Sequence, residues 1–150
     1  MSAFQPEDPD FEARVTNSFH QQKLMETIGA ALTRVAPGEV EIELPFKDSL
    51  TQQHGYMHGG VVTAIADSAC GYAALSLFPA GAEVLTVEYK VNFLAPATGP
   101  RLVARGRVIR RGRTISVCAC DVIAVGDPIE THVALMVATM VSSGKKARAG

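Results

Sequence analysis

The sequence predicts an α+β domain in which a curled antiparallel sheet of about five to six strands wraps around one long central helix. Three patterns predict this fold. An apolar run rich in small side chains, long enough for a helix, extends from Gly59 to about Leu77. A stretch that alternates between apolar and acidic residues precedes it and indicates a strand. Several runs rich in β-branched residues follow it, separated by turn sequences.

Composition favours one globular domain. The chain of 150 residues is 47% hydrophobic and has a net charge of -1, so it has the apolar content for a core and no overall charge that attracts nucleic acid or a membrane surface. We expect a flexible tail over 1–16, a single domain over 17–143 and a C-terminal tail over 144–150. Apolar stretches are shorter than the ~20 residues of a membrane helix, and the acidic start does not resemble a secretory signal, which favours the cytoplasm.

The elements before the central helix follow from local patterns. Asn17 or Ser18 suits the N-cap of a short amphipathic helix, which ends at Gly29. Residues 32–46 then alternate with a period of two, which predicts one half-exposed strand. A polar loop over 47–57 leads to the central helix.

The central helix is unusual because most of its side chains are small, which lets a sheet approach its backbone closely. Pro79 and Gly81 end it. We expect four further strands in the style of an antiparallel meander, and the last two breaks between them are short enough for hairpins. These strands are predicted over 83–94, 102–110, 114–125 and 129–142.

The three cysteines, Cys70, Cys118 and Cys120, are an odd number, so we expect buried thiols and no disulfide framework. Cys118 and Cys120 are closer in sequence than a typical pair of metal ligands, and no second pair of ligands completes them. We therefore expect no metal site.

The central helix begins with His58, Gly59 and Gly60 and contains a lone acid, Asp67, in its apolar run. A helix N-terminus has unpaired N–H groups and the positive end of a dipole, which suit a polarised carbonyl or an anion. A carboxylate in an apolar run is costly unless it is paired or used. The pattern predicts a site that holds an electrophile beside a base. The alternative is a structural Asp67 that accepts hydrogen bonds from the backbone or Thr63.

Gly59 and Asp67 of one chain are too far apart to act on one carbonyl. At ~1.5 Å per residue, the eight residues between these positions give ~12 Å along the helix axis. A second copy with an antiparallel helix would bring its Asp67 opposite the first Gly59 and create two symmetric sites. We therefore expect a homo-oligomer, a dimer at minimum, and further pairing into a tetramer.

The residues from Gln52 to Leu77, together with Thr86 to Pro96, resemble the hot-dog-fold acyl-CoA thioesterases of the phenylacetic-acid-degradation (PaaI-like) type. That family has His-Gly-Gly at the start of a central helix, an acid nine residues beyond the histidine, and a strand that ends in an aromatic residue and a proline. The resemblance covers about residues 18–143. It implies hydrolysis of an acyl-CoA to free CoA and a carboxylic acid, with no cofactor besides the CoA of the substrate.

The resemblance also implies residue roles. Asp67 matches the catalytic carboxylate, which acts as general base or nucleophile, and Gly59 matches the residue whose N–H polarises the carbonyl. Gln52 matches an Asn or Gln near that carbonyl, with Gln53 as the alternative. Thr86 matches a Ser or Thr that holds the attacking water, and an ordinary strand threonine is the alternative.

His58 and Gly60 are expected to support the site rather than react. A side chain just before a helix is typical of a cap or an orienting group, so we favour this role for His58 over proton transfer. Gly60 lets backbone or ligand approach closely.

Arginines form a second pattern, with no acid between Glu88 and Asp121. The basic strip consists of Arg101, Arg105, Arg107, Arg110, Arg111 and Arg113. Arginines at a hairpin suit the phosphates of CoA, and a solvated strand face is the alternative. The turn residues Arg111, Gly112 and Arg113 are the expected CoA-binding residues, because similar turns lie near the nucleotide in the related enzymes.

Two other functions stay open, and a third is disfavoured. A hot-dog enoyl-CoA hydratase or dehydratase needs a histidine base, which His58 would supply. A non-catalytic module would bind acyl-CoA without releasing thiol. Nucleic-acid binding is disfavoured, because the basic strip has no aromatic side chains to stack on bases. Among acyl-CoA substrates, the resemblance favours aryl or short-to-medium acyl groups.

Overall fold

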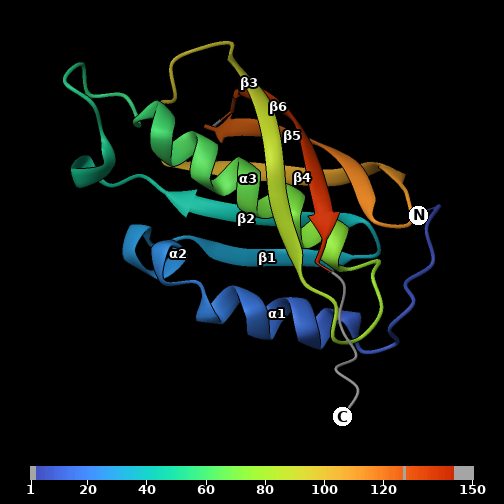
Figure 1. Cartoon of the computed structure of the whole chain (residues 1–150). Coiled ribbons are helices and arrows are strands. Elements are labelled where there is room, and N and C mark those ends of the chain that lie inside the picture. Colours follow the sequence, from blue (N-terminus) through green and yellow to red (C-terminus); the bar gives the residue numbers. More distant parts are fainter. Residues whose placement is uncertain (1–2, 127, 144–150) are drawn as a thin grey trace.

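The computed structural model describes residues 3–126 and 128–143, so the predicted C-terminal tail over 144–150 lies outside the described residues. One curled antiparallel sheet wraps around the long helix α3 (Gly59–Leu75), and the helix α1 (Phe11–Gln21) lies beside the strand β1 (Figure 1). The α+β architecture expected from the sequence, and the hot-dog fold that its resemblance implies, are confirmed.

The first helix begins earlier than the sequence predicts. α1 starts at Phe11, and a separate short helix α2 (Lys23–Ile28) follows it. Val15 and Phe19 are buried on one face of α1 because they lie four residues apart. The expected tail over 1–16 is therefore wrong from Phe11 onward, where the polar composition hid an amphipathic helix.

The segment before α1 is also held by side chains. Asp8 is buried, accepts a 2.9 Å hydrogen bond from the Asp10 N–H and lies 3.3 Å from the Arg14 guanidinium. The same guanidinium donates to the carbonyl of Leu75 at the end of α3 and to those of Phe78 and Pro79 in the turn that follows. Arg14 thereby satisfies carbonyls that a helix C-terminus leaves free.

The stretch expected to be one strand over 32–46 is a hairpin. β1 (Ala31–Ala36) and β2 (Glu39–Pro45) pair antiparallel around a two-residue turn, in which Gly38 has a φ of 76°. A turn this short leaves the alternation of apolar and polar residues almost unbroken. The sequence pattern therefore did not reveal the turn. The completely buried side chains of β2 are Val40, Ile42 and Leu44.

The six strands are arranged in the order β1-β2-β4-β5-β6-β3, and every neighbouring pair is antiparallel. The last four strands are β3 (Val84–Phe93), β4 (Arg101–Arg111), β5 (Ile115–Val125) and β6 (Glu130–Ser142). β4, β5 and β6 form the expected meander, but β3 pairs with β6 at the sheet edge. The connection over 94–100 is too long to impose a hairpin with β4, so the sequence predicted the strand but not its neighbour.

Small residues bring α3 close to the sheet. Ala66, Ala69 and Ala73 are completely buried. A Cβ added to Gly106 on β4 would lie 2.6 Å from both the carbonyl carbon and the carbonyl oxygen of Ala69. The close approach expected from the helix composition is confirmed, and glycine at position 106 makes it possible.

All three cysteines are buried, as expected. Across residues 3–126 and 128–143, no helix combines the length and the apolar character required to cross a membrane.

We expect Gly106→Ala to lower the free energy of unfolding by about 1–3 kcal/mol, because the new methyl group would overlap the α3 backbone. Urea unfolding followed by circular dichroism measures the change. Gly71→Ala in α3 is the matched control, since its Cβ would meet no atom within 4 Å. The control should gain about 0.5–1 kcal/mol from helix propensity. Equal stability of wild type and Gly106→Ala would contradict the close packing.

Candidate active site

The start of α3 presents one uncommitted backbone donor. His58 is the N-cap, and its Nδ1 accepts a 2.8 Å hydrogen bond from the Gly60 N–H. Among the hydrogen bonds of the described residues, none uses the Gly59 N–H. A Cβ on Gly60 would lie 3.1 Å from the same Nδ1, so Gly60 leaves room for the imidazole. His58 therefore supports the helix start as expected.

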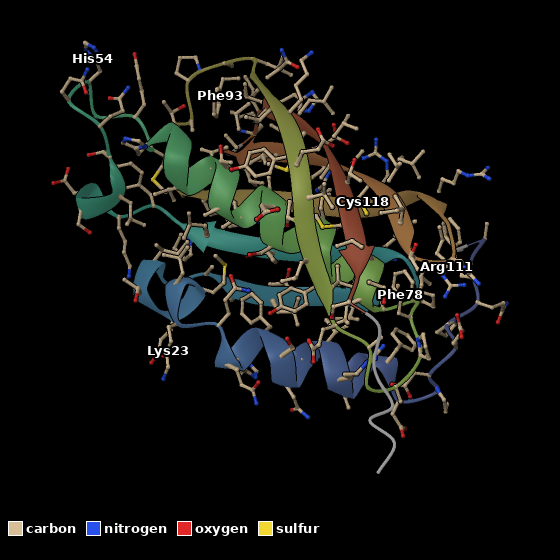
Figure 2. All side chains as sticks on the ribbon, viewed as in Figure 1. Lys23, His54, Phe78, Phe93, Arg111 and Cys118 are labelled. Atoms are coloured by element: carbon tan, nitrogen blue, oxygen red, sulfur yellow. The ribbon has the colours of Figure 1, made fainter. Side chains whose placement is uncertain are left out.

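Gln52 lies beside this helix start. Gln52, Tyr56, Gly59 and Phe93 line one pocket of about 420 Å³, and the Phe93 ring is near Gly59 (Figure 2). The Gln52 side-chain oxygen accepts a 2.6 Å hydrogen bond from the His54 N–H. Its NH₂ group makes no hydrogen bond within the described part of the chain. Gln53 is exposed and does not line this pocket, so the geometry favours Gln52.

Asp67 lies two turns further along α3 and is held by the edge strand. Its Oδ1 accepts a 2.8 Å hydrogen bond from the Thr86 hydroxyl on β3. Thr63, the partner considered for a structural Asp67, instead donates to the Gly59 carbonyl at 2.8 Å. The fold therefore brings Asp67 and Thr86 together from segments that are far apart in sequence.

Burial raises the pKa of Asp67, and the hydrogen bond from Thr86 lowers it by a smaller amount. Burial has this effect because removing water disfavours the charged carboxylate. A carboxylate whose pKa lies closer to neutral is a stronger base when ionised. The environment of Asp67 therefore suits proton abstraction.

Polar residues that the sequence patterns did not assign to the site surround Asp67. A second cavity, of about 200 Å³, lies beside it and is lined by Ser18, Gln22, Ser68 and Tyr72 among others. Ser18 and Gln22 lie four residues apart on or just after α1, and Ser68 and Tyr72 lie four apart on α3. The four-residue spacing within each pair was the sequence signal that could have identified these residues, since residues four apart share a helix face.

The flank of α3 that carries Gly59 and Asp67 opens onto the edge strand. Gly59, Asp67, Tyr89 and Phe93 line a shallow hollow between α3 and β3. β3 has β6 as its partner on one side, so its other backbone edge is unpaired in the described chain. The large exposed apolar residues of this strand are Leu85, Val87, Tyr89 and Phe93.

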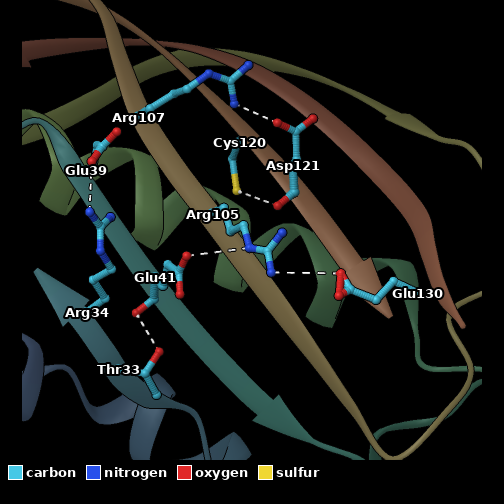
Figure 3. Close-up of polar contacts among 9 residues, drawn as sticks. All are labelled: Thr33, Arg34, Glu39, Glu41, Arg105, Arg107, Cys120, Asp121 and Glu130. Carbon is cyan, nitrogen blue, oxygen red and sulfur yellow. Dashed lines mark hydrogen bonds and ion pairs between the residues drawn. The ribbon is translucent and has the colours of Figure 1, made fainter. Parts of the chain in front are cut away.

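The predicted basic strip is largely neutralised across strands. Arg105 lies 3.5 Å from Glu41 and 3.9 Å from Glu130, and Arg107 lies 2.6 Å from Asp121 (Figure 3). These acids come from β2, β5 and β6, so they lie on strands other than the one that carries the arginines. The strip is therefore not a continuous basic surface, because strand pairing places carboxylates beside its arginines.

The three predicted CoA-binding residues differ in their contacts. Arg111 pairs with Glu7, and its guanidinium lies 4.7 Å from the centre of the Phe78 ring (Figure 2). The Gly112 N–H closes the hairpin by donating to the Ile115 carbonyl at 2.8 Å. Arg113 is exposed and forms no ion pair among the described residues.

The β4–β5 hairpin lies at the same end of the sheet as Asp67. Thr86 pairs with Met140, Met140 with Ser116, and Ser116 with Arg111. Three strand spacings of ~4.8 Å place Arg111 ~14 Å from Thr86 across the sheet. The hairpin is therefore near the Asp67 half of the site rather than the Gly59 half.

We expect Asp67→Asn to raise the melting temperature near neutral pH. The folded protein holds the Asp67 proton more tightly than the unfolded chain, whose pKa is near 3.8, so stability is lost as pH rises through the folded pKa. The gain from Asp67→Asn should shrink as the pH falls toward about 4. Thermal unfolding over this range measures it, with the exposed Asp48→Asn as control. A gain independent of pH would contradict the shifted pKa.

Comparison with known proteins places the chain in a family. Residues 54–130 match the model of the thioesterase superfamily. A thioesterase family protein from Silicibacter pomeroyi is 45% identical, with a TM-score of 0.86 over 88% of this chain and 97% of that chain. The 1,4-dihydroxy-2-naphthoyl-CoA hydrolase of Listeria monocytogenes is 29% identical over 63% of this chain and 76% of that protein. The E. coli PaaI protein shares the fold, with a TM-score of 0.81 and 17% identity over 93% of this chain and 98% of that chain. The chain belongs to the thioesterase superfamily and has its hot-dog fold.

Proposed function

We propose that this protein hydrolyses an acyl-CoA thioester to free CoA and a carboxylic acid. The observation that carries the proposal is the placement of Asp67. Its carboxylate is half-buried, has a raised pKa, is held by Thr86 and lies on the same open helix flank as the uncommitted Gly59 N–H. An acyl-CoA hydrolase among the relatives supports CoA as the thiol.

We infer that the functional unit is a homodimer joined along β3. Because Gly59 and Asp67 lie ~12 Å apart on one helix, a single chain supplies only half of each site. Antiparallel pairing of two β3 edges satisfies their free backbone groups and covers exposed side chains such as Tyr89 and Phe93. The two-fold axis would bring Asp67 of one subunit to the partner's Gly59.

In this arrangement the partner's Gly59 N–H donates to the thioester oxygen, where negative charge develops in the transition state. The Gln52 amide lies beside that donor in the same subunit. Asp67 removes a proton from a water molecule held by Thr86, and the water oxygen attacks the carbonyl carbon. The C–S bond then breaks, and the proton passes to the departing CoA sulfur. Direct attack by the free Asp67 Oδ2, followed by hydrolysis of the anhydride, is the alternative.

The phosphates of CoA are proposed to bind at the β4–β5 hairpin. Arg113 is exposed there and is not neutralised within the described chain. Arg111 would bind a phosphate after releasing the Glu7 carboxylate, its partner in this structure. Gly112 keeps the turn compact. Arginine suits this role because its fork of donors matches phosphate oxygens.

Hydrolysis is favoured over hydration or dehydration because the chain belongs to the thioesterase superfamily and because His58 serves as the cap of α3. Its Nδ1 is used by the Gly60 N–H, whereas Asp67 is bound by Thr86. The naphthoyl substrate named for the Listeria relative supports an aryl acyl group, within the aryl or short-to-medium range. Three buried free thiols support a reducing compartment, the cytoplasm.

We expect Asp67→Asn to lower kcat by about 10²–10⁴-fold, since it removes the base while keeping an oxygen for the Thr86 hydrogen bond. A thiol-release assay across an acyl-CoA panel measures the loss and identifies the substrate. Asp48→Asn, which replaces an exposed aspartate that lines none of the cavities at Gly59 or Asp67, is the control. Hydrolysis by Asp67→Asn at the wild-type rate would refute the proposal, and acyl-CoA binding without thiol release would favour a binding module.

The shared site predicts complementation between two inactive variants. Gln52→Ala should lose about 10²-fold in kcat, because it removes a group beside the Gly59 donor. A heterodimer of Asp67→Asn and Gln52→Ala, co-expressed with two tags, contains one complete site and should recover up to about half of the wild-type rate. Recovery no greater than that of the parent variants would show that each chain works alone.

We expect Arg113→Gln to raise KM for acyl-CoA about tenfold with little change in kcat, because the arginine binds CoA away from the reacting carbonyl. Steady-state kinetics on the preferred acyl-CoA separates the two parameters. Arg34→Gln, which removes an exposed arginine paired with Glu39 on the β1–β2 hairpin, is the control. An unchanged KM would exclude Arg113 from the CoA site.

A further inference from the structure

The segment that precedes α1, residues 3–10, reaches the β4–β5 hairpin, and we call it the N-terminal arm (Figure 1). The Glu7 carboxylate of this arm forms an ion pair with the Arg111 guanidinium of β4, although 104 positions separate the two residues in sequence. The arm therefore occupies one of the arginines that the proposed function assigns to CoA.

The N-terminal arm is held on both sides of Glu7 by other contacts. Phe4 packs against the core, and a Cβ added to Gly38 would lie 3.0 Å from its ring. Asp8 is buried and lies 3.3 Å from the Arg14 guanidinium. Because none of these contacts involves the Glu7 side chain, Glu7 can leave Arg111 while the arm stays in place.

The Arg111 guanidinium is held in position by its neighbours. It lies 4.7 Å from the centre of the Phe78 ring, which is itself buried (Figure 2). Its Nε is buried and has no hydrogen-bond partner among the described residues. The Arg111 side chain is 28% exposed and the Glu7 side chain 45% exposed, so a ligand that approaches this guanidinium from solvent meets the Glu7 carboxylate.

Charge decides which ligand group can replace that carboxylate. A carboxylate has one negative charge, whereas a phosphate monoester has a charge of about −1.5 to −2 near neutral pH and three acceptor oxygens. A phosphate with two ester or anhydride links has one negative charge, so its exchange for Glu7 would gain no attraction. CoA contains both kinds, since its 3′-phosphate is a monoester and its diphosphate bridge is not.

We propose that the 3′-phosphate of CoA displaces the Glu7 carboxylate from Arg111, so that Glu7 is an internal competitor that weakens the binding of CoA. The inference rests on the proposed function, which places the CoA phosphates at this hairpin. The exposed Arg113 is then left for the diphosphate bridge.

Internal competition also affects the end of the reaction. Glu7 is tethered beside Arg111, so bound CoA must keep the carboxylate away, and its apparent affinity falls by the fraction of protein in which Arg111 is free. The same competition favours departure of the CoA product, because the carboxylate returns to Arg111 when the phosphate leaves. Glu7 therefore lowers affinity for the substrate and for the product through one contact.

Glu7→Gln tests the competition because it keeps the size of the side chain and removes its charge. Isothermal titration calorimetry with free CoA measures binding without hydrolysis. We expect Glu7→Gln to bind CoA about tenfold more tightly than wild type and to bind 3′-dephospho-CoA with an affinity changed less than about twofold. Unchanged or weaker binding of CoA would overturn the proposal, and so would an equal gain for both ligands.

Glu39→Gln is the matched control. It makes the same change of net charge and also removes the carboxylate partner of an arginine, because Glu39 lies 3.1 Å from Arg34. Both affinities should stay within about twofold of wild type in this variant, since exposed pairs of this kind have small effects. A gain in CoA affinity equal to that of Glu7→Gln would show a general effect of charge and would overturn the local exchange.

A double-mutant cycle tests whether Glu7 acts through Arg111. In an Arg111→Gln background, Glu7→Gln should change the CoA affinity by less than about twofold, because no guanidinium is left to compete for. The full tenfold gain in that background would overturn the role of Arg111. If Arg111→Gln does not fold, the titrations of Glu7→Gln with the two ligands still decide the proposal.

Thiol release separates this inference from the proposed function. In a steady-state assay, free CoA should be a product inhibitor about tenfold stronger for Glu7→Gln than for wild type. If Glu7→Gln binds CoA more tightly but no acyl-CoA is hydrolysed, the proposed function is wrong and the assignment of Glu7 stands. If acyl-CoA is hydrolysed and Glu7→Gln binds CoA no more tightly, this inference alone is overturned.

Discussion

The close contact between α3 and the concave face of the sheet sets the orientation of the helix and, through it, the geometry of the site. Ala69 packs against Gly106 at backbone distance, so one face of the helix is completely buried and its rotation is fixed. That rotation directs Asp67 toward Thr86 on the edge strand and leaves the flank of α3 open beside Tyr89. A larger side chain at the contact would tilt or lift the helix and disturb both ends of the site.

A rigid helix also fixes the distance between the donor and the base. Gly59 and Asp67 are separated by ~12 Å of α-helix, which cannot shorten to serve one carbonyl. The unpaired edge of β3 lies beside both groups and carries exposed apolar side chains such as Phe93. The surface that would join two copies is therefore the surface that would complete two sites. Catalysis in the proposed enzyme thus depends on formation of the dimer.

The electrostatics of the chain depend on strand pairing more than on net charge. No acidic residue is close to Arg105 or Arg107 in sequence, yet Glu41 and Asp121 lie within ion-pair distance of them on neighbouring strands. Exposed pairs of this kind contribute little stability, about 0–1 kcal/mol each. Their larger effect is to remove a continuous positive surface and to leave Arg113 as an exposed charge at the hairpin that the proposal assigns to CoA.

Local sequence patterns were enough to predict the central helix, the number of late strands and the His58 cap, because each depends on residues that are neighbours along the chain or along one helix. They also identified Asp67 as the lone acid of an apolar run. The place of β3, the Asp67–Thr86 contact and the polar cavity beside Asp67 depend on tertiary packing. Those features join segments separated by long stretches of chain, and their geometry is set by packing rather than by local backbone preference.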